Sequence, residues 1–358
     1  MGTIRGKVIH YFSYDLIILV PHLAEIPLML KPSILDTGIY LPETIVSNQD
    51  IVKRVSKSGF SLLALTLKRA FRGNERRFAD ESMQTSDLAA NAARSILEKP
   101  NCPKIDLLIF AACSGDLLEP ATANIVQHKL GLTCPVMDIK NACNSMTSAL
   151  QVACAFVESG IYRNVLLVCG EKSSAVINFN PKNQTQFLRS VPGYTLGDAG
   201  VAMLVGPGED RKVVYHKFES YGDHWDLCTV AGGGSMHLRN PDKYYFEGDA
   251  AGLHAVIKSK ATTFMQDALT DLGLTTKDID WVVPHQIATT VVRAISDYVD
   301  IPLERFVDNF PFYGNTAAAS IPLALHTAVA DGRIKPGQRV MLLGLAAGVS
   351  ISIQVVEW

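Results

Sequence analysis

The sequence has no excess of positive charge, which limits the kinds of partner it can bind. It carries 33 Lys and Arg against 35 Asp and Glu, a net charge of −2 at neutral pH. Proteins that bind nucleic acid through its phosphates usually present a strongly basic surface. The charge balance therefore gives no sign of nucleic-acid binding, and an anionic partner would have to meet a local basic patch.

The cysteines do not form the pairs or clusters that disulfides and zinc sites need. There are seven of them, an odd number, and none is arranged as CxxC or grouped with histidine. A disulfide framework and a metal site are therefore not expected, whereas a reducing, cytoplasmic setting is. Most of these cysteines should be small buried hydrophobic side chains.

No apolar run is long enough to cross a membrane. The closest candidate, "DLIILVPHLAEIPLML", is interrupted by two acidic residues and two prolines, and it has no small-residue cleavage site. We expect neither a membrane span nor a signal peptide. Met29 opens "MLKPSILDTGIYLPE", which resembles a domain start, so residues 1–28 are either an extension or the product of a mis-chosen start codon.

Apolar runs typical of strands alternate with helical patterns along the rest of the chain. The strand-like runs include "KIDLLIFAA", "PVMDI", "RNVLLVCGE" and "GVAMLVG". This alternation predicts an α/β protein in layers, with a largely buried sheet.

An internal repeat divides the chain into two halves, 29–207 and 208–358. The segment "ACNSMTSALQVACAFVESGIYRNVLLVCG" can be laid over "GNTAAASIPLALHTAVADGRIKPGQRVMLLG", with Gly160 matching Gly332 and Cys143 opposite Asn315. Chance similarity between two Ala-rich helices is the alternative, but the match includes turns and strands as well.

The repeat brings together residues that are far apart in the sequence. "KIDLLIFAACSG" resembles "DIDWVVPHQIA", which places His285 at a strand end equivalent to the one near Cys113. Two equivalent halves packed about a pseudo-two-fold axis would bring matching strand ends and helix starts to the centre. Cys143, His285 and Asn315 are therefore expected to meet at one site.

Cys143 stands between a predicted core strand and a predicted buried helix. The free N–H groups and the dipole of a helix start favour a thiolate, which can attack a thioester and hold its acyl group covalently. A buried structural cysteine is the alternative, and it suits the other six. The position of Cys143 at the joint between strand and helix, together with the motifs that contain His285 and Asn315, favours a nucleophile over a structural cysteine.

Four motifs in a fixed order resemble those of a known family. "NAC" before a buried helix, "PHQ" after a strand, "YGNTAAASIPLAL" and "LGDAGVAML" are similar to β-ketoacyl-acyl-carrier-protein synthase III, one of the thiolase-like condensing enzymes. The resemblance covers about residue 30 to 358. It implies the thiolase fold, five layers in the order α-β-α-β-α, and a homodimer.

The resemblance also implies roles for the residues of the site. His285 and Asn315 would bind the carbonyl oxygen of a second thioester and stabilise its enolate, and the backbone N–H groups of Cys143 and Ala347 would form the oxyanion hole. Taken alone, His285 could be a structural histidine whose hydrogen bonds are satisfied at a strand end, and Asn315 could be an ordinary turn residue. Ala346 and Ala347 depart from the glycine-rich turn of the family.

Basic residues suggest where a thioester carrier binds. In the family, an arginine-bearing segment such as "KRAFRGNERRF", with Arg72, Arg76 and Arg77, helps to bind the phosphates of coenzyme A, and a tryptophan stacks on the adenine. No tryptophan occurs in this region, so the donor could arrive on a carrier protein. A solvated basic loop is the alternative. Arg293 follows the "PHQ" motif later than the family arginine does.

Glu119, in "SGDLLEPATA", departs from the enzymes that make fatty-acid primers, which usually have an aromatic residue here. A glutamate is similar to the thiolase-like enzymes that join two long acyl chains, in which it is proposed to remove an α-proton in the partner's pocket. A carboxylate in a dry pocket has a raised pKa suited to this step. The alternative is a helix-start carboxylate, because Glu-Pro commonly begins a helix.

The sequence predicts an acyl-thioester condensing enzyme that needs no cofactor other than its acyl-carrier-protein or coenzyme A thioesters. An acyltransferase that delivers the acyl group from Cys143 to an alcohol or amine remains an alternative. A catalytically silent scaffold subunit is disfavoured by the intact set of Cys143, His285 and Asn315.

Overall fold

The computed structural model describes residues 30–56 and 75–358. The N-terminal extension and Arg72 lie outside the described residues. Within the described part, no helix is long and apolar enough to cross a membrane.

The main sheet of the described residues has nine strands and consists of two half-sheets that are joined through one edge strand of each. The N-terminal half-sheet has five strands, in the order β1 (Pro32–Tyr40), β7 (Ala199–Pro207), β6 (Val165–Glu171), β4 (Leu107–Ala111) and β5 (Val136–Ile139). The C-terminal half-sheet has four, in the order β8 (Lys212–Ser220), β13 (Ser350–Glu357), β12 (Arg339–Ala346) and β11 (Trp281–Pro284). They are joined where Ser33 of β1 pairs with Lys212 of β8.

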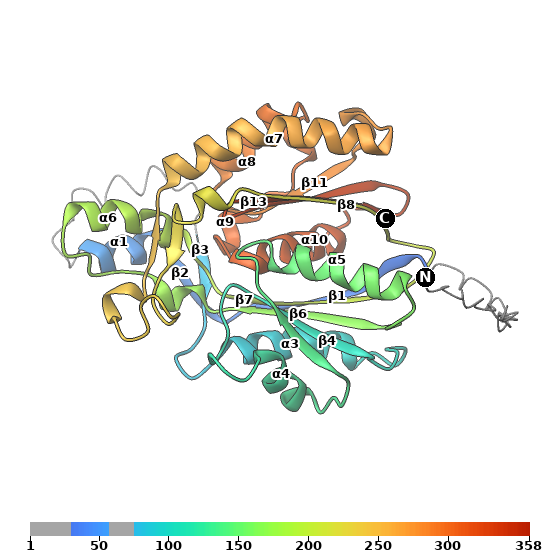
Figure 1. Ribbon diagram of the computed structural model, residues 1–358, viewed down its shortest axis with the longest axis horizontal. Coiled ribbons are helices and arrows are strands. Elements are labelled where there is room, and N and C mark those ends of the chain that lie inside the picture. Colours follow the sequence, from blue (N-terminus) through green and yellow to red (C-terminus); the bar gives the residue numbers. More distant parts are fainter. Residues whose placement is uncertain (1–29, 57–74) are drawn as a thin grey trace, which may run out of the picture.

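Helices cover both faces of these half-sheets and give five layers (Figure 1). The middle layer, α5 (Ser145–Glu158) and α10 (Ser320–Ala330), lies between the half-sheets. On one outer face are α3 (Thr85–Leu97) and α4 (Thr122–Leu130), and on the other are α7 (Ala250–Leu272) and α8 (Thr289–Val299). The chain therefore has the expected α-β-α-β-α arrangement.

The repeat found in the sequence is visible in the topology. Strands β4, β6, β7 and β1 pair in the same order and directions as β11, β12, β13 and β8. The equivalent helices α5 and α10 are each followed by a glycine with positive φ, 71° at Gly160 and 77° at Gly332. A left-handed residue after a helix favours glycine because it has no Cβ to clash.

Shorter elements gather beside the layers, at the ends of the central helices (Figure 1). Two small two-stranded sheets and three short helices lie there: β2 (Thr44–Ser47) with β3 (Glu75–Phe78), β9 (Cys228–Val230) with β10 (Phe246–Gly248), α1 (Asn48–Ser56), α6 (Gln184–Ser190) and α9 (Phe310–Tyr313). A separate apolar cluster that includes Ile51, Phe187 and Tyr194 holds several of them together.

Helix α3 packs against the N-terminal half-sheet through glycines. A Cβ added at Gly170 would lie 1.8 Å from the carbonyl oxygen of Thr85, and one added at Gly200 would lie 2.0 Å from that of Leu88. Both contacts are with backbone, so the helix would have to move. Close packing at Gly170 therefore fixes the end of β6, which reaches the site described below.

We expect Gly170→Ala to lower the free energy of unfolding by about 3 kcal/mol, the upper end for an overpacked core. The matched control is Gly222→Ala, because no atom lies within 4 Å of a Cβ built there. Urea unfolding of the two variants measures the difference. Equal midpoints for Gly170→Ala and the wild type would show that α3 is not packed this closely.

Candidate active site

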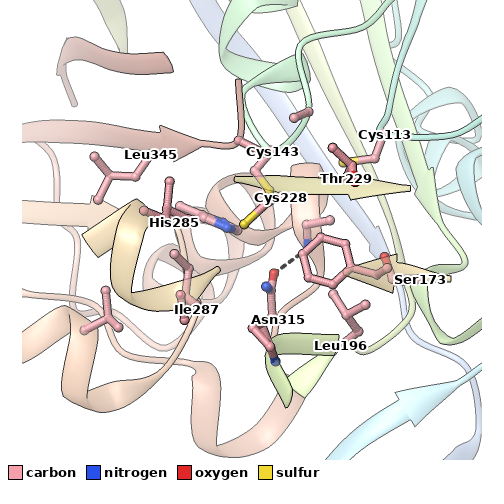
Figure 2. Close-up of a pocket in the computed structure, with 18 of the residues that line it drawn as sticks. Cys113, Cys143, Ser173, Leu196, Cys228, Thr229, His285, Ile287, Asn315 and Leu345 are labelled. Atoms are coloured by element: carbon pink, nitrogen blue, oxygen red, sulfur yellow. Dashed lines mark hydrogen bonds between the residues drawn. The ribbon is translucent and has the colours of Figure 1, made fainter. Parts of the chain in front are cut away.

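A cavity of about 330 Å³ lies where the two halves meet (Figure 2). Cys143, His285 and Asn315 all line it. Cys143 comes from the turn before α5, His285 follows β11, and Asn315 stands in the turn that leads to α10. The structure thus brings together the three residues that the sequence repeat predicted to converge.

The turn that presents Cys143 is held from both halves. Ala142, directly before it, has a φ of 45°, a left-handed conformation that is costly for a residue with a Cβ. The buried Asn144 side chain donates hydrogen bonds to the carbonyl and the hydroxyl oxygen of Ser350 on β13, at 3.2 and 3.0 Å. These bonds fix the start of α5 against the C-terminal half-sheet and compensate for the strained turn.

The surroundings of Cys143 favour its thiolate. A hydrogen bond with the Cys113 thiol and the neighbouring His285 lower the pKa of Cys143 well below its ordinary value, although burial acts in the opposite direction. The same hydrogen bond, together with burial, raises the pKa of Cys113. Of these two thiols, Cys143 is therefore the one that forms a thiolate more readily.

His285 is held rigidly, with 1% of its surface exposed. Its backbone N–H donates to the carbonyl of Leu343 on β12 at 2.9 Å, and its Nδ1 atom is buried without a partner among the described residues. The next residue, Gln286, bonds to Val307 and Asn309 and locks the turn. The backbone that carries the imidazole is therefore held in place at the cavity wall.

Asn315 is oriented by its own turn. Its backbone N–H donates to Thr195 at 2.8 Å, and its carbonyl accepts from Gly197 at 2.9 Å. Its side-chain oxygen accepts from the backbone N–H of Ala317 at 2.9 Å, as Figure 2 shows. With the oxygen engaged, the amide N–H group is the donor that Asn315 can offer to a ligand.

The rest of the cavity is mostly apolar. Ala347, in the turn between β12 and β13, lines it beside Cys143, where the oxyanion hole was predicted. Further walls come from the turn before β7, the small sheet and the outer helices, among them Leu196, Phe246, Leu253, Ile257, Val291 and Ile295. An apolar chamber beside a thiolate suits an acyl chain attached through a thioester.

Glu119 and Arg293 lie outside this cavity. Glu119 is exposed, in the loop between β4 and α4, and Arg293 is exposed on α8. Neither is among the residues that line the chamber within one subunit. Their predicted roles, which involve a second subunit or a carrier, stay predictions.

The structure corrects the prediction for Arg76. Its side chain is 0% exposed, lies on β3 and bonds to Asn48, so it cannot bind a phosphate from solvent. Alternation along the short strand turns Arg76 inward. Arg77 is half-buried, and its guanidinium donates to the carbonyls of Pro42 and Glu43 at 3.4 and 3.3 Å, which holds it against the chain's own backbone.

The polar residues of the cavity that were not predicted from the sequence include Glu171, at the end of β6, and Cys113, after β4. Glu171 is 1% exposed, and burial raises its pKa to about 8. The repeat did point to the strand end near Cys113. A glutamate followed by a lysine after an apolar run, in contrast, reads as an ordinary polar turn.

Comparisons with known proteins agree with this geometry. Residues 137–222 match the family model of 3-oxoacyl-[acyl-carrier-protein] synthase III, and residues 269–358 match the model of its C-terminal part. The chain is 32% identical over 316 residues to β-ketoacyl-[acyl-carrier-protein] synthase III of Neisseria meningitidis serogroup A, covering 87% of this chain and 94% of that protein. With the enzyme of the same name from Thiobacillus denitrificans it shares 34% over 324 residues, 89% and 97% of the two chains.

Solved structures give the same result. Cerulenin-bound OleA of Xanthomonas campestris superposes with a TM-score of 0.82 at 26% identity, over 92% of this chain and 98% of that one. FabH of Pseudomonas aeruginosa superposes with a TM-score of 0.80 at 25% identity, with the same coverage. Since the motifs, the layered fold and the relatives agree, the chain belongs to the β-ketoacyl-[acyl-carrier-protein] synthase III family of thiolase-fold condensing enzymes.

Proposed function

We propose that the chain loads an acyl group onto Cys143 and joins it to a second thioester by Claisen condensation. The observation that carries this proposal is the convergence of Cys143, His285 and Asn315 on one apolar chamber from three separate turns. The thiolate forms the acyl thioester, and the two donors then stabilise the enolate oxygen of the acceptor. The reaction needs no cofactor, since the substrates are themselves activated thioesters.

The relatives support carbon–carbon bond formation over transfer to an alcohol or amine, because they are named β-ketoacyl-[acyl-carrier-protein] synthase III and a β-ketoacyl product contains a new carbon–carbon bond. By the same likeness, we propose carrier-protein or coenzyme A thioesters as substrates, a homodimer, and a cytoplasmic setting. Arg293 is exposed beside the chamber-lining positions of α8, where it could contact the carrier.

The test is product analysis with a panel of acyl thioesters, each offered with malonyl carrier protein or with a second acyl thioester. We expect a 3-oxoacyl product with at least one acceptor. Acyl transfer to added alcohols or amines, with no carbon–carbon bond formed with any acceptor, would support the acyltransferase alternative instead.

Glu119 decides which acceptor the enzyme uses. Malonyl thioester gives its carbanion by losing carbon dioxide, whereas an ordinary acyl thioester must lose an α-proton to a base. We propose that Glu119 supplies this base to the chamber of the partner subunit. The neighbouring Leu117 and Leu118 are 57% and 75% exposed, an apolar loop that a partner would cover.

We expect Glu119→Gln to lower condensation with an acyl acceptor by about a hundredfold, the usual minimum for loss of a general base, while Cys143 still acylates. Mixed dimers of a Cys143→Ala chain with a Glu119→Gln chain contain one chamber with both groups. They should regain part of the activity. Full activity of Glu119→Gln with every acceptor would make the residue a helix-start carboxylate and favour the malonyl reaction.

A further inference from the structure

Glu171 is a buried carboxyl that the reaction described above does not use. It ends β6 and reaches the wall of the chamber that holds Cys143. Its Oε1 atom accepts the backbone N–H of Cys113 at 2.7 Å and that of Ala318 at 3.3 Å. One carboxyl oxygen thus ties the loop after β4 to the turn that carries Asn315.

A line of polar groups connects this carboxyl with the nucleophile. The backbone N–H of Cys113 bonds to Glu171, and the Cys113 thiol interacts with the Cys143 thiol and with Glu171 strongly enough to shift their pKa values. Figure 2 shows Cys113 and Cys143 facing the same chamber. A proton can therefore move between Cys143 and Glu171 without passing through bulk water.

The protonation states of the three groups fit such a transfer. Burial and, less strongly, the nearby Cys143 thiolate raise the pKa of Glu171 to about 8, against the hydrogen bonds from Cys113 and Ala318. The pKa of Cys143 is lowered. These opposite shifts favour a negative charge on Cys143 and a proton on Glu171.

Other ionisable groups around Glu171 do not compete for this role. Cys169 on β6 has a raised pKa because it is buried, and it stays protonated. The ammonium of Lys172 is held by backbone carbonyls, the nearest being that of Met83 at 2.6 Å. The remaining ones lie elsewhere on the chamber wall: Lys140, Cys228, His254 and His285.

We propose that Glu171 stores the proton that Cys143 has given up through Cys113, and that it delivers this proton to the thiolate that leaves when Cys143 is acylated. The inference rests on the proposed function, because it assumes that Cys143 attacks a thioester. It assigns acylation a proton donor of its own, separate from His285 and Asn315, which serve the condensation.

The protons and bonds balance in each step. In the resting site the Cys143 proton has passed to Cys113 and the Cys113 proton to Glu171, which leaves a Cys143 thiolate and a neutral carboxyl. The thiolate forms a bond to the carbonyl carbon, the original carbon–sulfur bond breaks, and the leaving thiolate takes the Glu171 proton. Condensation later releases Cys143 as a thiolate, and Glu171 takes one proton from water, which restores the resting site.

The test compares two donors with the same acyl chain and different leaving groups. The alkyl thioester of N-acetylcysteamine must have its leaving sulfur protonated, whereas the aryl thioester of 4-nitrothiophenol leaves readily as a thiolate. Glu171→Gln keeps an oxygen that can accept from Cys113 and Ala318 but carries no transferable proton. The rate at which acyl-Cys143 forms is followed by quenched-flow mass spectrometry.

We expect Glu171→Gln to slow acylation by the alkyl thioester about a hundredfold, the lower end for a positioned acid, and to leave the aryl thioester nearly unaffected. The ratio of the alkyl rate to the aryl rate does not depend on how much of the protein is folded, because unfolded protein lowers both rates equally. In the wild type this ratio should fall as pH rises through about 8, where Glu171 loses its proton. A ratio unchanged both by Glu171→Gln and by pH would overturn the proposal.

The same experiment can refute the proposed function and the proposed role of Glu171 independently. If neither thioester acylates wild-type Cys143, the proposed function is wrong. If both acylate it and the rate ratio does not change, Cys143 is still the nucleophile and only the role of Glu171 is lost.

Discussion

Cys143→Ala is expected to abolish condensation, lowering the rate on the order of 10⁴-fold or more, as removal of a catalytic nucleophile does in other enzymes. The sulfur is the only atom of Cys143 that can hold the acyl group. Alanine removes it and leaves the turn and the start of α5 in place. The pKa of Cys143 is lowered by the hydrogen bond with Cys113 and by His285, which favours the thiolate that the proposed acylation needs. Turnover measured with an acyl thioester and either acceptor gives the effect.

The matched control is Cys154→Ala, on the same helix. Cys154 is 1% exposed, and burial raises its pKa, so it should be inert. This variant should acylate at Cys143 as the wild type does. Retention of full activity by Cys143→Ala, or its loss in Cys154→Ala with the fold intact, would contradict the assignment of the nucleophile.

His285→Ala and Asn315→Ala are each expected to slow carbon–carbon bond formation by about 10²- to 10³-fold, the usual effect of losing one positioned donor to a developing oxyanion. Acylation of Cys143 should stay measurable in both variants, because the enolate forms only in the second step. Enzyme acylated in advance and then mixed with acceptor separates the two steps.

A second histidine provides the control for this pair. His326 lies on α10, and its Nδ1 atom is 2.9 Å from the Thr37 hydroxyl, away from the chamber. His326→Gln should condense at the wild-type rate. If His285→Ala instead blocked acylation and condensed normally once acylated, the two donors would serve the first step and the proposed division would be wrong.

The sequence predicted most of the site because its motifs stand at joints of a repeated unit. The Cys143 turn and the Asn315 turn precede equivalent helices, and His285 ends a strand equivalent to β4. Because the two halves are equivalent, the pseudo-symmetry alone predicts that these residues converge on one site.

The burial of a polar side chain on a short or fully covered strand was harder to predict. Arg76 sits in a run of basic residues that resembles a solvated loop, yet the pairing of β3 with β2 turns it inward. Glu171 ends a strand whose residues are all buried, so no alternation of apolar and polar residues marked its side. Its position between Cys113 and Ala318 depends on contacts across the two halves, which local sequence does not encode.

Intact-mass analysis of the acylated protein tests the central proposal most directly. Wild-type protein incubated with an acyl thioester should gain the mass of one acyl group, mapped to the peptide that contains Cys143. Adding the competent second thioester should remove that mass and release a 3-oxoacyl product. An adduct on Cys113 or Cys154 instead, or an acyl-Cys143 that no second thioester can discharge into a carbon–carbon product, would contradict the account.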